Sequence, residues 1–288
     1  MYNELEHTTI TTNGINLHVV FAGPTEGIPV ILLHGFPEFW RGWLKQIKPL
    51  ANAGYRVIVP DQRGYNLSDK PKGVRAYTVD KLTGDILGLV NALGYQQVNL
   101  IGHDWGAMVA WVFAIHHPER LRKLGILNVP HPAVMLNFLR RGDPEQLRRS
   151  WYIFAFQIPW LPEYFLCKND WRNAVHALRG SGKIHNFTNE DIAEYKQAWS
   201  QPRAMTAMIN WYRAAVRHWP KMPGGLCVHV PTLMLWGMQD VALSHRMARP
   251  SLDYCDDGKL IFFEDATHWV QHEEAEEVTK CLLDFLGK

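Results

Sequence analysis

The stretch LIGHDWGAMVAW, residues 100–111, sets a Gly-x-Asp-x-Gly motif between an apolar run and a helix-forming run. The apolar run predicts a buried strand, and AMVAW predicts a helix. A sharp strand-to-helix turn needs glycines for room and pushes its middle residue out at the end of the strand. We therefore expect Asp104 to stand on a tight turn, where it serves either as a reactive carboxylate or as an ordinary helix N-cap.

On both sides of this turn, apolar runs that predict strands alternate with stretches that predict helices. Short apolar runs that end in small or polar residues are typical of parallel strands buried on both faces. These runs are residues 29–35, 55–61, 97–104, 121–130, 230–237 and 259–265. Apolar residues at helical spacing predict helices over residues 78–94 and 273–287. Alternation of strand and helix indicates an α/β fold with a mostly parallel central sheet flanked by helices.

Two parts of the chain depart from this rhythm. The Asn-Gly pair at 13–14 lies within the β-rich residues 7–22 and predicts a tight hairpin. Residues 131–225 carry no strand pattern; they are rich in aromatic residues and arginine, with helix-like periodicity. We interpret them as a helical cap inserted into a core domain formed by residues 1–130 and 226–288.

Composition narrows the class of partner. The chain has 288 residues, 47% hydrophobic and 20% charged, with a formal net charge of +2, which suits a globular protein without a strong field for nucleic acid. No apolar run reaches the roughly 18 residues needed to cross a bilayer. We expect a small apolar partner, no nucleic acid, no membrane span, and a monomer or homodimer.

The cysteines indicate the compartment. Four cysteines stand far apart without a Cys-x-x-Cys pair, so neither a zinc motif nor a dense disulfide framework is indicated. They are typical of thiols in a reducing compartment, and the N-terminus lacks a signal-peptide pattern. We therefore expect a cytoplasmic protein that uses no cofactor and no metal.

Two further residues complete a catalytic pattern with Asp104. Asp240 follows the predicted strand 230–237, and His268 follows the next one. The chain order nucleophile, acid, histidine, with each residue at a strand end, is that of the α/β-hydrolase triad. The chain has 14 histidines, and this position distinguishes His268 from the others.

An aspartate at the nucleophile position changes the expected chemistry. A carboxyl group of ordinary pKa, about 3.9, is already ionised at neutral pH, so attack needs no base. Attack on an alkyl carbon gives an ester, which water then hydrolyses with His268 as general base and Asp240 as the acid that orients it. The oxyanion forms on Asp104 itself, and the expected backbone N–H donors are those of Trp105 and Phe36.

Several motifs resemble those of the soluble epoxide hydrolases of the α/β-hydrolase fold: HGFPEFW, DQRGYNLSD, GHDWG, the acid after WGMQ, and the final THW. The resemblance runs through nearly the whole chain. It implies an enzyme that converts an epoxide and water to a vicinal diol, and a cis bond before Pro37. It also implies two cap tyrosines that bind the epoxide oxygen, which fall on Tyr152 in SWYIFAFQ and Tyr212 in NWYRA.

A physical reason supports the two tyrosines. Opening an epoxide leaves a basic alkoxide, to which a phenol with a pKa near 10 can donate a proton. Periodicity alone would place Tyr152 and Tyr212 in the packing of the cap instead. We further expect four aromatic residues to line the substrate cavity: Phe36, Trp105, Phe154 and Trp211.

Two other functions remain as alternatives. Haloalkane dehalogenases are similar in fold and use the same aspartate and histidine, but commonly bind the halide with an Asn where this chain has Phe36, or with a second cap Trp. The cap tryptophans are Trp151, Trp160, Trp171, Trp199, Trp211 and Trp219. Phe36 and the tyrosine pair favour the epoxide. A non-catalytic, ligand-binding α/β hydrolase would be indicated by a broken triad, and here all three members are present.

Overall fold

A computed structural model describes residues 5–183, 186–218 and 225–287. Within these residues, eight strands form one sheet in the order β1-β2-β4-β3-β5-β6-β7-β8. The strands are β1 (Glu6–Thr12), β2 (Ile15–Ala22), β3 (Ile28–Leu33), β4 (Tyr55–Pro60), β5 (Val98–His103), β6 (Leu121–Leu127), β7 (Thr232–Gly237) and β8 (Gly258–Phe263). The pairs β1-β2 and β2-β4 are antiparallel and all others are parallel, which confirms the mostly parallel sheet.

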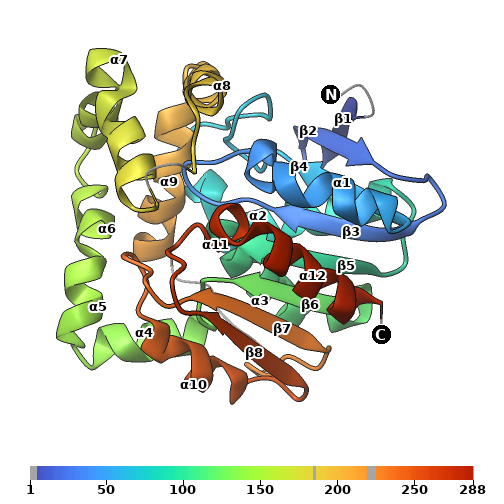
Figure 1. The fold of residues 1–288 in the computed structure, drawn as a ribbon. Coiled ribbons are helices and arrows are strands. Elements are labelled where there is room, and N and C mark those ends of the chain that lie inside the picture. Colours follow the sequence, from blue (N-terminus) through green and yellow to red (C-terminus); the bar gives the residue numbers. More distant parts are fainter. Residues whose placement is uncertain (1–4, 184–185, 219–224, 288) are drawn as a thin grey trace.

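The central strands are buried because helices cover both faces of the sheet (Figure 1). The helices are α1 (Leu44–Asn52), α2 (Val79–Ala92), α3 (Trp105–His116), α4 (Pro132–Arg140), α5 (Pro144–Arg149), α6 (Trp151–Ala155), α7 (Leu161–Gly180), α8 (Asn189–Trp199), α9 (Ala204–Arg217), α10 (Ala248–Leu252), α11 (Val270–Glu273) and α12 (Ala275–Leu286). Helices α1, α11 and α12 pack together, and α2 packs against α3.

The predicted hairpin and the two predicted helices of the core are present, with helix ends that differ by a few residues. Asn13 and Gly14 both have positive φ, 48° and 75°, as the tight hairpin requires. The helix expected over 78–94 is α2, and the one expected over 273–287 is α12, which the short helix α11 precedes. Helix α1 was not expected from the sequence, and it contains Pro49.

Helices α4 to α9, which we call the cap, all lie between β6 and β7 in the chain. Figure 1 shows them gathered to one side of the sheet, in green, yellow and orange. Because parallel strands all end at one edge of the sheet, the loops that follow β3, β5, β7 and β8 meet there. Among the described residues, no helix is both long and apolar enough to cross a membrane.

Candidate active site

Asp104 occupies the turn between β5 and α3. Its backbone has φ 50° and ψ −123°, a conformation that residues other than glycine rarely adopt. It holds the N-cap position of α3, yet its side chain makes no capping hydrogen bond. The carboxylate is therefore free of the structural role that an aspartate at this position usually has.

Close backbone approach explains two glycines around this turn. A Cβ atom on Gly106 would lie 2.2 Å from the carbonyl oxygen of Leu33, and one on Gly35 would lie 2.2 Å from Oδ1 of Asp104. Both distances are well inside van der Waals contact. Any side chain at either position would displace the turn or the carboxylate.

The loop after β3 supplies a hydrogen bond to the carboxylate. The backbone N–H of Phe36 donates to Oδ1 of Asp104 at 2.7 Å. Its expected role as an oxyanion donor stays a prediction. The predicted cis bond between Phe36 and Pro37 is confirmed. The cap holds this loop, because the indole N–H of Trp199 donates to the carbonyl oxygen of Pro37 at 2.6 Å. Trp105, the second residue expected to donate its backbone N–H, is the first residue of α3. Its role as a donor stays a prediction.

The structure brings Asp104, Asp240 and His268 together. Nδ1 of His268 lies 2.7 Å from Oδ2 of Asp240, and Nε2 lies 3.5 Å from Oδ2 of Asp104. The side chains of His268 and Asp240 are 6% and 0% exposed, and that of Asp104 is 15% exposed. The imidazole thus lies between two carboxylates, away from solvent.

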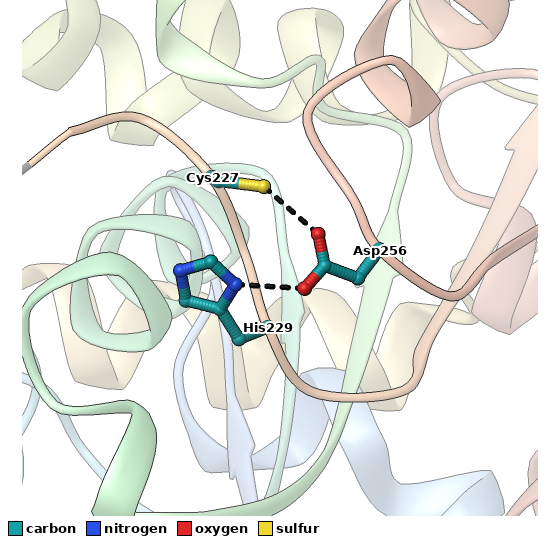
Figure 2. Close-up of side chains that lie close together, drawn as sticks. All are labelled: Cys227, His229 and Asp256. Carbon is teal, nitrogen blue, oxygen red and sulfur yellow. Dashed lines mark hydrogen bonds and ion pairs between the residues drawn. The ribbon is translucent and has the colours of Figure 1, made fainter.

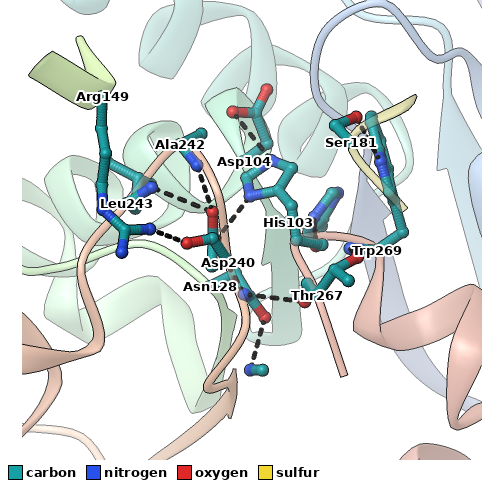
Figure 3. Close-up of polar contacts among 12 residues, drawn as sticks. His103, Asp104, Asn128, Arg149, Ser181, Asp240, Ala242, Leu243, Thr267 and Trp269 are labelled. Carbon is teal, nitrogen blue, oxygen red and sulfur yellow. Dashed lines mark hydrogen bonds and ion pairs between the residues drawn. The ribbon is translucent and has the colours of Figure 1, made fainter. Parts of the chain in front are cut away.

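Asp240 is held in place by several donors (Figure 3). Its Oδ1 accepts the N–H groups of Ala242 at 2.7 Å and Leu243 at 2.9 Å, and its Oδ2 accepts Nδ2 of Asn128 at 2.8 Å. Burial alone would raise the pKa of Asp240, but the charge of His268 and these hydrogen bonds hold it below its ordinary value. Asp240 is therefore a fixed negative charge behind His268.

The charge state of His268 follows from its two neighbours. Burial favours the neutral imidazole, but Asp240 and Asp104 together raise the pKa of His268 to about 10. At neutral pH the free protein therefore carries an imidazolium at His268. Loss of the charge on Asp104 would remove part of this stabilisation.

Sequence reasoning missed Asn128, which connects the loops that carry the acid and the histidine. Besides Asp240, its side chain binds the carbonyl oxygen of Thr267 at 3.3 Å and the N–H of Gly237 at 3.2 Å. Its own backbone has φ 55°. A positive φ in an asparagine after a strand is a weak sequence signal, because it does not name the partner. Arg149 of the cap also donates to the backbone carbonyl of Asp240.

Sequence reasoning also missed Glu38, a buried carboxylate in HGFPE. It accepts hydrogen bonds from the hydroxyl of Tyr195 at 2.7 Å, Nε2 of His272 at 2.7 Å and Nε2 of Gln271 at 3.1 Å. Burial favours the neutral acid, yet His272 holds the pKa of Glu38 far below its usual range. Glu38 thus joins the Phe36 loop to cap helix α8 and to the segment after His268.

A second connection runs from the partners of Glu38 to His268. Gln271 donates to Nδ1 of His103 at 3.0 Å, which leaves Nε2 of His103 to donate to the backbone carbonyl of His268 at 2.8 Å. Both the backbone and the ring of His268 are therefore fixed by buried partners.

The two cap tyrosines lie on different helices, Tyr152 on α6 and Tyr212 on α9. Their ring centroids are 5.8 Å apart. Both line one cavity of about 390 Å³ with Asp104. Burial and the charge of Asp104 raise the pKa of both phenols, so both are protonated donors at neutral pH.

The cavity is mostly apolar, and two of the four aromatic residues expected to line it do so. The lining residues are Asp104, Trp105, Met108, Val129, Pro130, Met135, Leu136, Leu139, Arg140, Ser150, Tyr152, Ile153, Phe154, Tyr212, Ala215, Val216 and Leu243. Trp105 and Phe154 are among them. Phe154 is 58% exposed and Val216 is 48% exposed, so the cavity opens at the surface of the cap.

Phe36 and Trp211 are placed differently from the expectation. The ring of Phe36 packs edge-on against Tyr212, with ring centroids 5.3 Å apart, and contributes its N–H rather than a wall of the cavity. Trp211 is 1% exposed, and its indole N–H donates to the carbonyl oxygen of Arg63 at 2.9 Å. Trp211 therefore fastens the cap to the core. Helical periodicity could not separate that face of α9 from the face of Tyr212, its neighbour in the chain.

The other cap tryptophans also lie away from the cavity. Trp151 and Trp160 are 68% and 73% exposed. Trp171 packs against Trp199, whose indole N–H is bound to Pro37. Trp219 lies outside the described residues. Of the tryptophans that the structure describes, only Trp105 contributes to the lining.

Within the part of the chain that the structure describes, no three donor atoms at this site lie close enough together to share a metal ion. Among the described residues, the one group of three whose donor atoms are close enough to share an ion is Cys227, His229 and Asp256, which lies elsewhere.

The elbow, the three triad residues at strand ends and the cap define an α/β hydrolase. The α/β hydrolase fold family matches residues 28–166 of the chain. The chain is 47% identical over 277 residues to the AB hydrolase superfamily protein YfhM of Bacillus subtilis, with 96% of each chain covered. It is 38% identical over 281 residues to epoxide hydrolase 1 of Caenorhabditis elegans, covering 95% of this chain and 68% of that one.

A solved structure is similar over the whole fold. The crystal structure of Bacillus megaterium epoxide hydrolase in complex with an inhibitor matches with a TM-score of 0.88 and 30% sequence identity, covering 98% of this chain and 100% of that one. The chain belongs to the epoxide hydrolases of the α/β-hydrolase fold.

Proposed function

We propose that the protein hydrolyses a small apolar epoxide to a vicinal diol through a covalent ester on Asp104. One observation carries the proposal: a carboxylate on the core and two protonated phenols on the cap, those of Tyr152 and Tyr212, line the same apolar cavity. An epoxide needs a nucleophile at carbon and a donor at oxygen. The cavity offers both.

In the first step, Oδ2 of Asp104 attacks an epoxide carbon while the bond from that carbon to the ring oxygen breaks. The choice of oxygen follows from the hydrogen bond that Phe36 makes to Oδ1. The alkoxide that forms takes a proton from Tyr152 or Tyr212. Because the phenols are held in the cavity, they donate without first reorganising solvent.

Ester formation then prepares His268 for the second step. The ester is neutral, so the negative charge 3.5 Å from Nε2 disappears. The pKa of His268 therefore falls, and its imidazolium releases one proton. This release balances the proton that the phenol gave to the alkoxide. Asp240 keeps the imidazole oriented, with Nε2 available as a general base.

In the last step, His268 takes a proton from water, and the water oxygen attacks the carboxyl carbon of Asp104. The negative charge develops on Oδ1, where the N–H of Phe36 already donates, and the N–H of Trp105 is the second proposed donor. Collapse of this intermediate breaks the bond between the carboxyl carbon and Oδ2, and the second proton of the water passes to Oδ2. The diol leaves with Oδ2, and Asp104 regains a carboxylate.

Isotope labelling in a single turnover tests the covalent route. With enzyme in excess over epoxide in heavy-oxygen water, label should enter the carboxylate of Asp104, found by mass spectrometry of its peptide. The first diol should be unlabelled, and label should appear in diol only when excess epoxide allows later turnovers. Label in the first-turnover diol would mean direct attack by water and would overturn the proposal.

The tryptophan placement supports an epoxide over a haloalkane. A halide needs N–H donors, and Trp105 is the only described tryptophan in the lining. A matched panel of epoxides and haloalkanes of similar size separates the two activities. Diol formation without halide release is the expected result, and the opposite result would assign the protein to the dehalogenases.

A further inference from the structure

Cys227, His229 and Asp256 bring a sulfur, a nitrogen and an oxygen donor together at the surface (Figure 2). Sγ of Cys227 lies 3.2 Å from one carboxylate oxygen of Asp256, and Nδ1 of His229 lies 2.8 Å from the other. The donor atoms all lie within 4.8 Å of one another. The mechanism of epoxide hydrolysis uses none of these residues.

The backbone explains why these three side chains meet. Val228, between Cys227 and His229, is 0% exposed and forms a parallel bridge with Cys255. Its N–H donates to the carbonyl oxygen of Tyr254 at 2.7 Å, and its own carbonyl oxygen accepts the N–H of Asp256 at 3.1 Å. In an extended segment, the residues on either side of an inward-pointing residue both point outward. The donors therefore stand on a paired backbone that core packing fixes.

We propose that Cys227, His229 and Asp256 bind one Zn²⁺ ion. Thiolate, imidazole and carboxylate are the zinc ligands of proteins, at about 2.0–2.3 Å from the ion, so tetrahedral ligand atoms lie about 3.3–3.7 Å apart. The observed spacings of 2.8 and 3.2 Å need only a small opening, and the third pair of donor atoms, within 4.8 Å, needs at most a modest closing of these surface side chains. Water completes the coordination.

The hydrogen bonds of the cluster show what the ion replaces. The carboxylate of Asp256 accepts from the Cys227 thiol and faces Nδ1 of His229. On binding, the thiol proton is released to solvent, and the imidazole offers the lone pair of its Nδ1 to the metal. Zn²⁺ then lies between the three donor atoms.

The position of the cluster indicates a structural role for the ion. It lies before β7, whereas Asp240 lies just after that strand, and the six residues of β7 alone span roughly 20 Å. Zinc would join the segment that precedes β7 to the loop that precedes β8. The cysteine spacing in the sequence could not indicate this site, because Cys227 and Asp256 are 29 residues apart and only one cysteine takes part.

Titration of the chelator-treated protein with Zn²⁺ and with Co²⁺ tests the proposal. We expect one ion per chain, and with Co²⁺ a near-ultraviolet thiolate charge-transfer band. The changes His229→Gln and Asp256→Asn should each weaken zinc binding at least tenfold, and Cys227→Ser should also abolish the cobalt band. Cys281→Ser, which changes another partly buried thiol, is the matched control and should alter neither.

Thermal unfolding gives a second readout. Zinc should raise the Tm of the unchanged protein but not of the Cys227→Ser variant, since a ligand stabilises only the fold that binds it. Epoxide turnover of that variant should stay unchanged. Failure to take up one ion per chain would overturn the proposal, and so would uptake and a cobalt band that persist in Cys227→Ser.

Discussion

Nε2 of His268 lies 3.5 Å from Oδ2 of Asp104, so the proposed base and the proposed nucleophile form an ion pair before any substrate is bound. A protonated histidine cannot act as a base. In the proposed reaction the first step removes the charge on Asp104 that keeps His268 protonated. His268 can therefore act as a base only after the ester has formed, which fixes the order of the two steps.

Asp104→Asn should lower the pKa of His268. The asparagine has the shape of the carboxylate without its charge, as the ester has, and loss of an opposite charge at this distance lowers a pKa by about 1–3. Titration of the His268 ring by NMR measures the value, which is about 10 in the unchanged protein. An equal pKa in both proteins would contradict the proposed order of events.

Stability at alkaline pH should follow the same ion pair. The pKa of His268 in the folded protein, about 10, is above the ordinary value of 6.5, so its contribution to stability is fully present below pH 6.5 and is lost as pH rises through 10. Urea unfolding between neutral pH and pH 11 should show a steeper loss for the unchanged protein than for Asp104→Asn. Parallel curves would show that the pair does not stabilise the fold.

His268→Gln should stop the reaction at the ester. Attack by Asp104 needs no base, whereas hydrolysis does, so intact-protein mass spectrometry should find a stable adduct of one epoxide per chain. The double change Asp104→Asn and His268→Gln is the control and should carry no adduct. An adduct in the double variant would move the nucleophile to another residue.

Tyr152→Phe and Tyr212→Phe should each slow ester formation by about 10²-fold, the usual contribution of a positioned proton donor. Stopped-flow tryptophan fluorescence, to which Trp105 contributes from the lining of the cavity, follows this step. Tyr164→Phe, on a cap residue that is 63% exposed, is the control and should react normally. Unchanged rates in both active-site variants would return these tyrosines to a packing role.

Asn128→Ala should slow ester hydrolysis more than ester formation. It removes a hydrogen bond to the charged Asp240, which is worth about 1.5–3 kcal/mol, or about 10–100-fold in rate. Only hydrolysis depends on the orientation of His268. Separate measurement of the two steps decides the matter, and equal slowing of both would indicate a general disturbance of the site.

Glu38→Gln should destabilise the protein, because it removes a buried charge that accepts hydrogen bonds from Tyr195, His272 and Gln271, each worth about 1.5–3 kcal/mol. The pKa of Glu38 lies far below its ordinary value of 4.5, so its contribution is present above pH 4.5 and is lost as pH falls toward the folded-state value. Urea unfolding at neutral pH measures the change. Glu6→Gln removes an exposed partner of Arg56 and should have little effect.

The turn at Asp104, the series of parallel strands and the order of the triad could be predicted because each depends on a short, continuous stretch of sequence. A buried parallel strand is a continuous apolar run, and a strand-to-helix turn carries its own glycines. Asp104, Asp240 and His268 each follow such a run. The common edge of a parallel sheet then brings them together without further information.

The supporting residues could not be predicted in this way. Glu38 and Asn128 act through partners that are far away in the sequence, such as Tyr195 and Asp240. A short apolar pattern likewise shows that α9 is buried, but not which of Trp211 and Tyr212 faces the cavity. These choices depend on how the cap packs on the core, which is a property of the folded chain.

The hydrogen bond from Phe36 gives the two oxygens of Asp104 different fates. In the proposed reaction Oδ1 stays with the protein for its lifetime, while Oδ2 leaves in the diol and is replaced from water. The atom that attacks each new epoxide is thus solvent oxygen acquired one cycle earlier. The nucleophile is a renewable part of the enzyme, and each product molecule carries away the oxygen that the preceding turnover had installed.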